Sequence, residues 1–134
     1  MRRSADEIVA AARALLGIRF QPQGRSPESG LDCIGVVAAS VGVERVPRDY
    51  ALRGGSHERL GAELEAAGLR RVGAPRAGDV LVLAAGSAQL HLGIFTGTGL
   101  VHGDAGLRRV VERPAPLPWP IIHIWRLDPD VRED

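Results

Sequence analysis

Residues 31–42 read LDCIGVVAASVG, and this segment holds the single cysteine of the chain. Asp32 belongs to the residue types that cap helix N-termini, and Gly42 belongs to those that end helices. Between them, an apolar stripe recurs at helical spacing: Ile34, Val37, Ala38 and Val41. We therefore predict a helix that begins with Cys33 in its first turn, although the β-branched residues would also suit a buried strand.

Two further helices are expected on either side of this segment. Ser4 and Glu7 form a capping box, in which the two residues satisfy each other's backbone N–H groups at a helix start. Apolar residues follow at helical spacing as far as Gly17, which is a stop signal. Residues 18–30 are rich in Gly, Pro and Ser and predict a structured loop. Another helix is predicted from about Ser56 to Ala67.

From residue 79 onward the sequence changes to short runs typical of strands: DVLVLA, LHLGIFTG, GLVHGD, LRRVVE and IIHIW. Turn residues at 97–99 and 104–106 predict antiparallel hairpins between the middle three runs. Helices followed by strands indicate an α+β fold, with N-terminal helices packed on one side of an antiparallel sheet of about five strands. We expect one domain, residues 1–134, with a frayed polar end at 128–134.

Composition and charge exclude several classes of function. The 134 residues are 45% hydrophobic and 25% charged, with a net charge of +1, which gives no electrostatic basis for a nucleic-acid or anionic-membrane partner. The pairs Arg70–Arg71 and Arg108–Arg109 are interpreted as solvated surface. No segment approaches the ~20 apolar residues of a membrane span. Asp6 and Glu7 interrupt the first apolar run, so we expect synthesis in the cytoplasm without a signal peptide.

Cys33 is the first candidate for chemistry. A free cysteine is most often buried and inert, but this one lies at a predicted helix start. A helix N-terminus favours an anion by at most about 2 kcal/mol, and about 1.36 kcal/mol corresponds to one pKa unit. Papain-type cysteines reach pKa values of about 3–4, and they do so by pairing with a histidine. We therefore predict an imidazolium within hydrogen-bond reach of Cys33.

His91 is the predicted partner. Strand alternation places it on one face with Gly93 and Phe95, and we expect Gly93 to leave room for the helix end. His102 follows on the next strand, where residues of neighbouring strands lie ~5 Å apart, so it could hold the second ring nitrogen of His91. The other two histidines, His57 and His123, are interpreted as ordinary helix and strand residues.

Four segments in this order, LDCIGVV, PRAGDVLVL, HLGIFTG and LVHG, resemble the NlpC-type cell-wall peptidases, a papain-like family. The resemblance extends from Ser4 to about Trp125. It implies that Cys33 is the nucleophile, His91 the general base and His102 the residue that orients His91. It further implies cleavage of an amide bond in peptidoglycan stem peptides, commonly between D-glutamate and a diamino acid, through a thioester. The backbone N–H of Cys33 would then bind the oxyanion, and neither metal nor cofactor is needed.

The chain departs from many members of this family before and after the cysteine. Ile34 stands where many members have Ser, and this residue and the QGR at Gln23–Arg25 resemble a short subgroup encoded in phage and gene-transfer-agent tail clusters. The resemblance thus implies phage-like tail proteins as partners. Phe20 stands where many relatives carry a Tyr whose hydroxyl helps to build the site. Loss of an oxyanion donor costs about 3–4 kcal/mol, so Gln21 or Gln23 is a candidate substitute.

Other readings of the same residues remain open. The chain could be a catalytically silent tail or scaffold subunit, or it could catalyse a different acyl transfer with the same fold. It could also bind zinc through Cys33, His91, His102 and a fourth histidine, although structural zinc sites typically use ligand pairs a few residues apart. The Pro-rich residues 113–120 predict an extended connection with Trp119 packed on the core, or else a polyproline ligand for an SH3-like partner.

Overall fold

The structure is a computed structural model that describes residues 2–42, 57–86 and 89–127. Its helices are α1 (Ala5–Arg13), α2 (Cys33–Val41) and α3 (His57–Ala66). Its strands are β1 (Arg25–Ser26), β2 (Gly30–Leu31), β3 (Leu69–Val72), β4 (Val80–Gly86), β5 (Gln89–Phe95), β6 (Gly99–Asp104), β7 (Arg109–Pro114) and β8 (Ile121–Leu127). The expected fraying of residues 128–134 lies outside the described residues.

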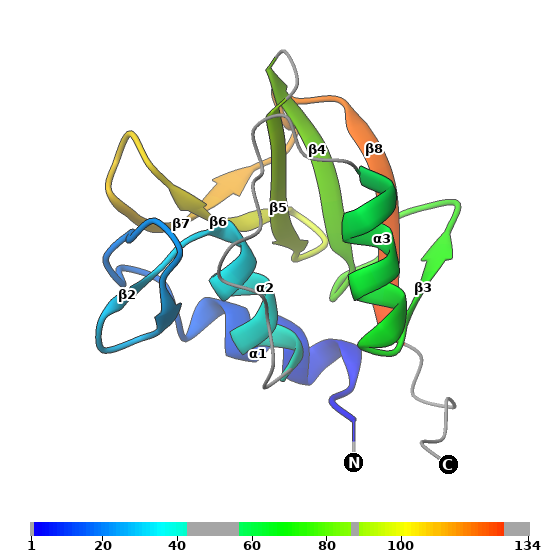
Figure 1. Ribbon diagram of the computed structural model, residues 1–134, viewed down its shortest axis with the longest axis horizontal. Coiled ribbons are helices and arrows are strands. Elements are labelled where there is room, and N and C mark those ends of the chain that lie inside the picture. The colour runs from blue at the N-terminus through cyan, green and yellow to red at the C-terminus, as the bar shows by residue number, and fades with distance from the viewer. Residues whose placement is uncertain (1, 43–56, 87–88, 128–134) are drawn as a thin grey trace.

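The described strands form a six-stranded antiparallel sheet in the order β3-β8-β4-β5-β6-β7 and a small β1–β2 pair (Figure 1). The predicted hairpins β5–β6 and β6–β7 are confirmed. Strand β8 lies between β3 and β4, so the last described strand is an interior strand rather than an edge strand. The sixth strand is β3, which sequence analysis missed because LRRV is short. Its two arginines, Arg70 and Arg71, are exposed as predicted.

The helix termini follow the local signals in the sequence. Ser4 and Glu7 form the capping box, with Ser4 N–H donating to Glu7 Oε1 at 2.9 Å. Asp32 caps α2 by accepting from Gly35 N–H at 2.9 Å, and the helix ends at Gly42 in the left-handed conformation. The segment that the sequence allowed as a helix or a strand is therefore a helix.

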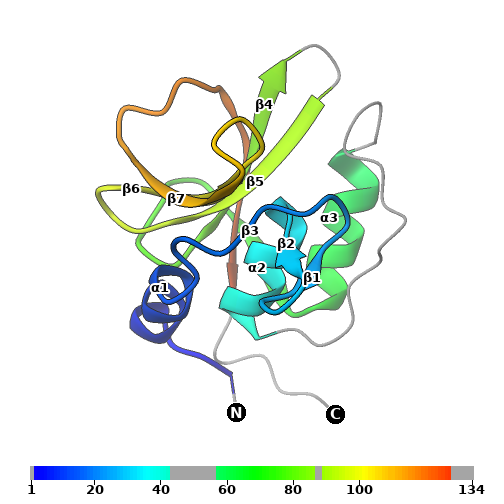
Figure 2. The same cartoon turned by 90° about the vertical axis from the view of Figure 1, so that its left-hand side faces the viewer.

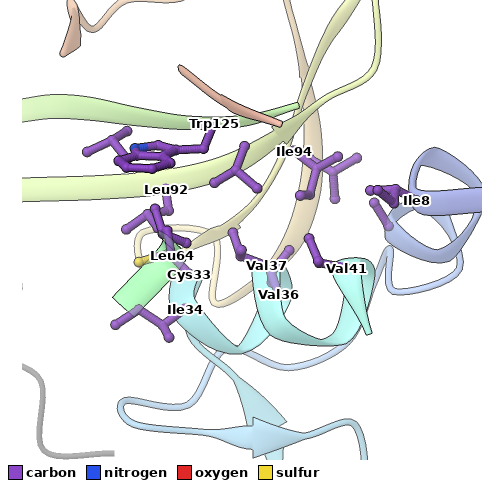
Figure 3. Packing of buried hydrophobic residues seen from close by; sticks show 14 of the residues in the cluster. Ile8, Cys33, Ile34, Val36, Val37, Val41, Leu64, Leu92, Ile94 and Trp125 are labelled. Carbon is purple, nitrogen blue, oxygen red and sulfur yellow. The ribbon is translucent and has the colours of Figure 1, made fainter. Parts of the chain in front are cut away.

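All three described helices lie on one side of the six-stranded sheet (Figure 2). Figure 3 shows side chains of α1 and α2 directed at β5 and β8 in the core between these layers. The main core includes these buried residues: Ile8, Val36, Val37, Val41, Leu64, Leu92, Ile94, Val101 and Trp125. The predicted packing of helices on one side of an antiparallel sheet is thus confirmed. No described helix is long and apolar enough to cross a membrane.

A second, smaller cluster covers the opposite face of the sheet, because alternate strand residues point to opposite faces. It consists of Leu81, Leu83, Leu100 and Ile124, with Phe95, Leu117 and Trp119 packed against it. Leu117 and Trp119 belong to the Pro-rich connection between β7 and β8. This segment is therefore a connection between two strands, and its apolar side chains pack against the sheet. The prediction of an extended connection with Trp119 packed on the core is confirmed.

The loop that carries β1 and β2 packs directly on the first turn of α2. A Cβ atom built on Gly35 would lie inside van der Waals contact with the carbonyl oxygen of Gly24, and 3.0 Å from a methyl carbon of Leu31. The Gly24 oxygen also accepts from Asp32 N–H at 3.3 Å. Gly35 is thus needed where the loop backbone meets the helix.

Gly35→Ala is expected to lower the free energy of unfolding by about 1–3 kcal/mol, because the added methyl group overpacks this contact. Gly73→Ala is the matched control, since a Cβ atom there meets nothing within 4 Å. Urea unfolding of both variants measures the difference. Equal midpoints for the two variants would contradict the close contact.

Candidate active site

Cys33 is the first residue of α2 and is only 3% exposed. Figure 3 shows its side chain at the start of the helix, close to Leu92 of β5. The backbone N–H groups of Leu92 and Ile34 both face the sulfur and favour its thiolate form. The sulfur therefore lies against the backbone amide between His91 and Leu92. The Leu92 side chain belongs to the core on the helix side, whereas the His91 ring contacts Trp119, which packs on the opposite face of the sheet.

The helix end packs against Gly103 of β6 rather than against the predicted Gly93. A Cβ atom on Gly103 would lie 3.5 Å from the backbone nitrogen of Cys33 and 3.4 Å from the carbonyl carbon of Asp32. A Cβ atom on Gly93 would instead collide with Leu100. The prediction for Gly93 is therefore wrong. Alternation placed Gly93 on the face of β5 that meets Leu100, whereas Leu92 lines the face of β5 that is covered by α2.

The two strand histidines are in direct contact. His91 Nε2 and His102 Nδ1 are 2.8 Å apart, and the two rings are nearly perpendicular, with centroids separated by 4.9 Å. His91 is half-buried, while His102 is only 2% exposed. In the tautomer where His91 donates through Nε2, its Nδ1 keeps a lone pair and can accept a proton. The contact between adjacent strands that the sequence predicted is thus present.

The charge states differ from those expected for a papain-type pair. Burial, reinforced by the Asp32 carboxylate, raises the pKa of the Cys33 thiol to about 12. Burial, and then the neighbouring His102, lowers the pKa of His91 to about 4. Both groups are therefore neutral at pH 7, and the hydrogen bonds of the described residues include none between the sulfur and the His91 ring. Desolvation outweighs the helix end, so the predicted imidazolium is wrong for this structure.

The histidine pair makes stability depend on pH. Burial lowers the pKa of His102 as well as that of His91, so the folded chain resists protonation that the unfolded chain accepts below pH 6.5. The free energy of unfolding should therefore fall as the pH drops from 6.5 to 4, with His91 contributing at most about 3 kcal/mol. Urea unfolding across this range measures the loss, and His91→Gln should reduce it. A wild-type profile that is flat over this range would contradict the burial of the pair.

Trp119 completes the aromatic surroundings of this pair. Its ring centroid lies 5.2 Å from that of His91 and 5.3 Å from that of His102, both in edge-to-face arrangements. The guanidinium of Arg113 lies 5.6 Å from the Trp119 centroid. The sequence predicted that Trp119 packs on the core, without indicating its neighbours. Nothing in the Pro-rich stretch indicated contact with the histidines.

The loop before the cysteine supplies backbone groups and one buried cation to the helix start. Phe20 is half-buried, and its ring lies 3.3 Å from the Cβ position of Gly103, so it borders the site. The side chains of Gln21 and Gln23 are exposed, and Gln23 contacts Asp32 through its backbone N–H at 3.0 Å. A role for either glutamine side chain stays a prediction.

Arg25 of this loop is a site residue that the sequence patterns did not predict. Its Nη1 donates to Asp32 Oδ1 at 2.6 Å, and the two side chains are 9% and 11% exposed. A single arginine in a loop rich in Gly, Pro and Ser would ordinarily be predicted to be exposed to solvent. Only its position seven residues before a capping aspartate could have suggested an ion pair.

The described residues contain no group of three or more His, Cys, Asp or Glu side chains that could hold a metal ion. The zinc reading has no support from the arrangement of Cys33, His91 and His102. His123 lies half-buried on β8. The side chain of His57 lies outside the described residues.

Comparisons with known proteins identify the fold. No protein-family model matches the chain, and no curated protein is similar to it in sequence. Among solved structures, NlpC2 from Trichomonas vaginalis superposes with a TM-score of 0.68 at 15% identity, over 92% of this chain. This chain spans only 46% of that protein's length and 44% of the length of NlpC1 from the same organism.

Two shorter structures match over most of their length. The NlpC/p60 domain of the peptidoglycan hydrolase SagA has a TM-score of 0.58 at 24% identity, covering 84% of this chain and 90% of that domain. RipD from Mycobacterium tuberculosis, described as a non-catalytic NlpC/p60 protein adapted to peptidoglycan binding, has a TM-score of 0.60 at 14% identity. The match covers 95% of this chain and 99% of RipD. The chain therefore has the papain-like NlpC/p60 fold, as the sequence predicted.

Proposed function

We propose that this chain is a cysteine hydrolase of the NlpC type that cleaves an amide bond in peptidoglycan stem peptides. One observation carries the proposal: the Cys33 sulfur lies at the start of α2 against the peptide that follows His91, and His91 in turn contacts His102 at 2.8 Å. The fold shared with a peptidoglycan hydrolase supports the substrate class. The sequence segments that resemble the family carry the same three residues.

The neutral resting state sets the order of proton transfers. His91 Nδ1 takes the thiol proton as the Cys33 sulfur attacks the amide carbonyl, which gives a tetrahedral oxyanion. His91 then donates this proton to the leaving amine, and a thioester remains on Cys33. A water molecule, deprotonated by His91, attacks the thioester and releases the carboxylic acid and the thiol. His102 holds the His91 ring in the tautomer that this sequence of steps needs.

The backbone N–H of Cys33 is the proposed oxyanion donor. It is the first N–H of α2, where no carbonyl within the helix can accept from it. Its neighbours in the first turn are already occupied: Gly35 N–H donates to the Asp32 side chain and Val36 N–H to the Asp32 carbonyl. A preorganised donor of this kind acts on charge that develops only in the transition state.

The proposed activity is tested by digestion of purified peptidoglycan, with released muropeptides identified by mass spectrometry. Wild-type protein should release new fragments, and Cys33→Ala should release none, because the nucleophile is absent. The cut is proposed between D-glutamate and the diamino acid, which predicts fragments with a new amine on that diamino acid. If folded wild-type protein yields the same fragments as Cys33→Ala, the hydrolase proposal is wrong.

The setting of this activity is also proposed, on the resemblance of Ile34 and of Gln23–Arg25 to the tail-associated subgroup. The chain would be made in the cytoplasm and would act at the cell wall, carried there by phage-like tail proteins. Gradient centrifugation of lysates that contain particles should then show co-migration of the chain with the particles. A chain found only in the low-density fractions would contradict delivery by a tail.

A second candidate is a non-catalytic subunit with the same fold. The observation that favours it is the burial of the thiol, which raises the pKa of Cys33 to about 12. RipD, described as non-catalytic and peptidoglycan-binding, matches over nearly its whole length. In this case the wild-type chain would co-sediment with insoluble peptidoglycan and release nothing. Release of fragments in the same assay would exclude the second candidate.

A further inference from the structure

The residues around the Cys33 sulfur carry opposing charges. Asp32 precedes the cysteine and provides the helix cap, and Arg25 of β1 pairs with it at 2.6 Å. His91 of β5 and His102 of β6 contact Trp119, which packs on the opposite face of the sheet, and burial lowers the pKa of both rings while the nearby Asp104 acts in the other direction. Among the described residues, the charges that act on the sulfur are the carboxylate of Asp32 and the guanidinium of Arg25.

The carboxylate of Asp32 stabilises the start of α2, but its negative charge disfavours a thiolate on the adjacent Cys33. Its carboxylate accepts from Gly35 N–H at 2.9 Å and from Gln23 N–H at 3.0 Å, so it joins the loop to the first turn of α2. Because this carboxylate is negative and adjacent to Cys33, it opposes a second negative charge on the sulfur and raises the thiol pKa. The guanidinium of Arg25 acts in the opposite direction.

We propose that Arg25 is a positioning residue of the Cys33 site: its buried guanidinium neutralises the Asp32 carboxylate, so that this carboxylate can cap α2 without opposing a negative charge on the adjacent sulfur. The pair is nearly closed to solvent, at 9% and 11% side-chain exposure, so water screens its charges poorly. Arg25 also donates to the Gly24 carbonyl at 3.0 Å, which fixes the guanidinium against the loop. The catalytic value of this arrangement rests on the proposed function, because only a nucleophile needs its thiolate.

The experiment measures the thiolate directly and needs no substrate. The second-order rate of alkylation of native protein by iodoacetamide is measured at pH 8, 9 and 10, where it is proportional to the small thiolate fraction. Arg25→Met removes the charge at similar length and should lower the rate about tenfold at each pH, equivalent to an upward pKa shift of about one unit. Arg25→Lys should stay within about threefold of wild type.

Removal of the opposing charge distinguishes electrostatic from purely structural action. The double variant Arg25→Met with Asp32→Asn should recover to within about threefold of the wild-type rate, because both charges are then absent. Asp32→Asn alone keeps a capping side chain and should react about tenfold faster than wild type, so it also serves if Arg25→Met does not fold. Arg19→Met, a charge removed from an exposed position of the same loop, should leave the rate unchanged.

Two results would overturn the inference. One is an Arg25→Met protein that reacts as fast as wild type. The other is a failure of Asp32→Asn to raise the rate, either alone or in the double variant. These results are independent of the peptidoglycan assay. A chain that releases no muropeptides but shows the predicted order of alkylation rates would retain the charge pairing and lose the proposed function.

Discussion

His91→Ala is expected to lower the rate of peptidoglycan hydrolysis by about 10²–10⁴-fold, which is the range for loss of a general base. The expected loss is large because the resting thiol is neutral. With burial raising the pKa of Cys33 to about 12, almost no thiolate forms without a base to take the proton. The variant should bind substrate as before, so the loss should appear in kcat rather than in KM.

Two further variants make this result specific. His102→Ala leaves the His91 ring in place and removes its contact at 2.8 Å, so it should lose less activity than His91→Ala. Thr98→Ala, at the exposed turn between β5 and β6, should retain wild-type activity. Thermal unfolding of each variant shows whether the fold is intact. A folded His91→Ala protein with wild-type kcat would remove His91 from the proposed mechanism.

Asp79→Ala is expected to lower the free energy of unfolding by about 3 kcal/mol, the lower end of the range for breaking a buried ion pair. Asp79 is 1% exposed and makes a two-point contact with Arg126 of β8, with both N–O distances at 2.8 Å. It also accepts from Arg76 N–H at 2.8 Å, which holds the turn before β4. The variant leaves Arg126 without its carboxylate partner, and because that side chain is 23% exposed, water offsets part of the cost.

The chain contains a matched control with the same geometry and different burial. Arg13 and Glu112 also make a two-point contact, with both N–O distances at 3.0 Å, but their side chains are 46% and 24% exposed. Arg13→Ala should therefore cost at most about 1 kcal/mol. Urea unfolding of both variants at pH 7 gives the two values. A loss for Arg13→Ala as large as that for Asp79→Ala would show that burial does not set the strength of these pairs.

Much of the fold follows from short-range patterns that the sequence displays directly. The capping pair Ser4 and Glu7 and the Asp32 cap predicted where two helices begin, because capping satisfies backbone groups within the same turn. Turn residues predicted the hairpins of β5, β6 and β7 for a similar reason. Strand β3 was missed because its four residues depend on pairing with β8, more than fifty positions away along the chain.

In the candidate site, too, some features could be predicted from the sequence and others could not. The residue types and their order along the chain were sufficient to select Cys33, His91 and His102, and strand adjacency was sufficient to predict contact between the two rings. Only the tertiary structure decided that the thiol and the imidazole are both neutral, that Gly103 receives the helix end, and that Arg25 and Trp119 border the site. These features depend on desolvation and on contacts between segments that are distant along the chain. Neither produces a local or periodic pattern in the sequence.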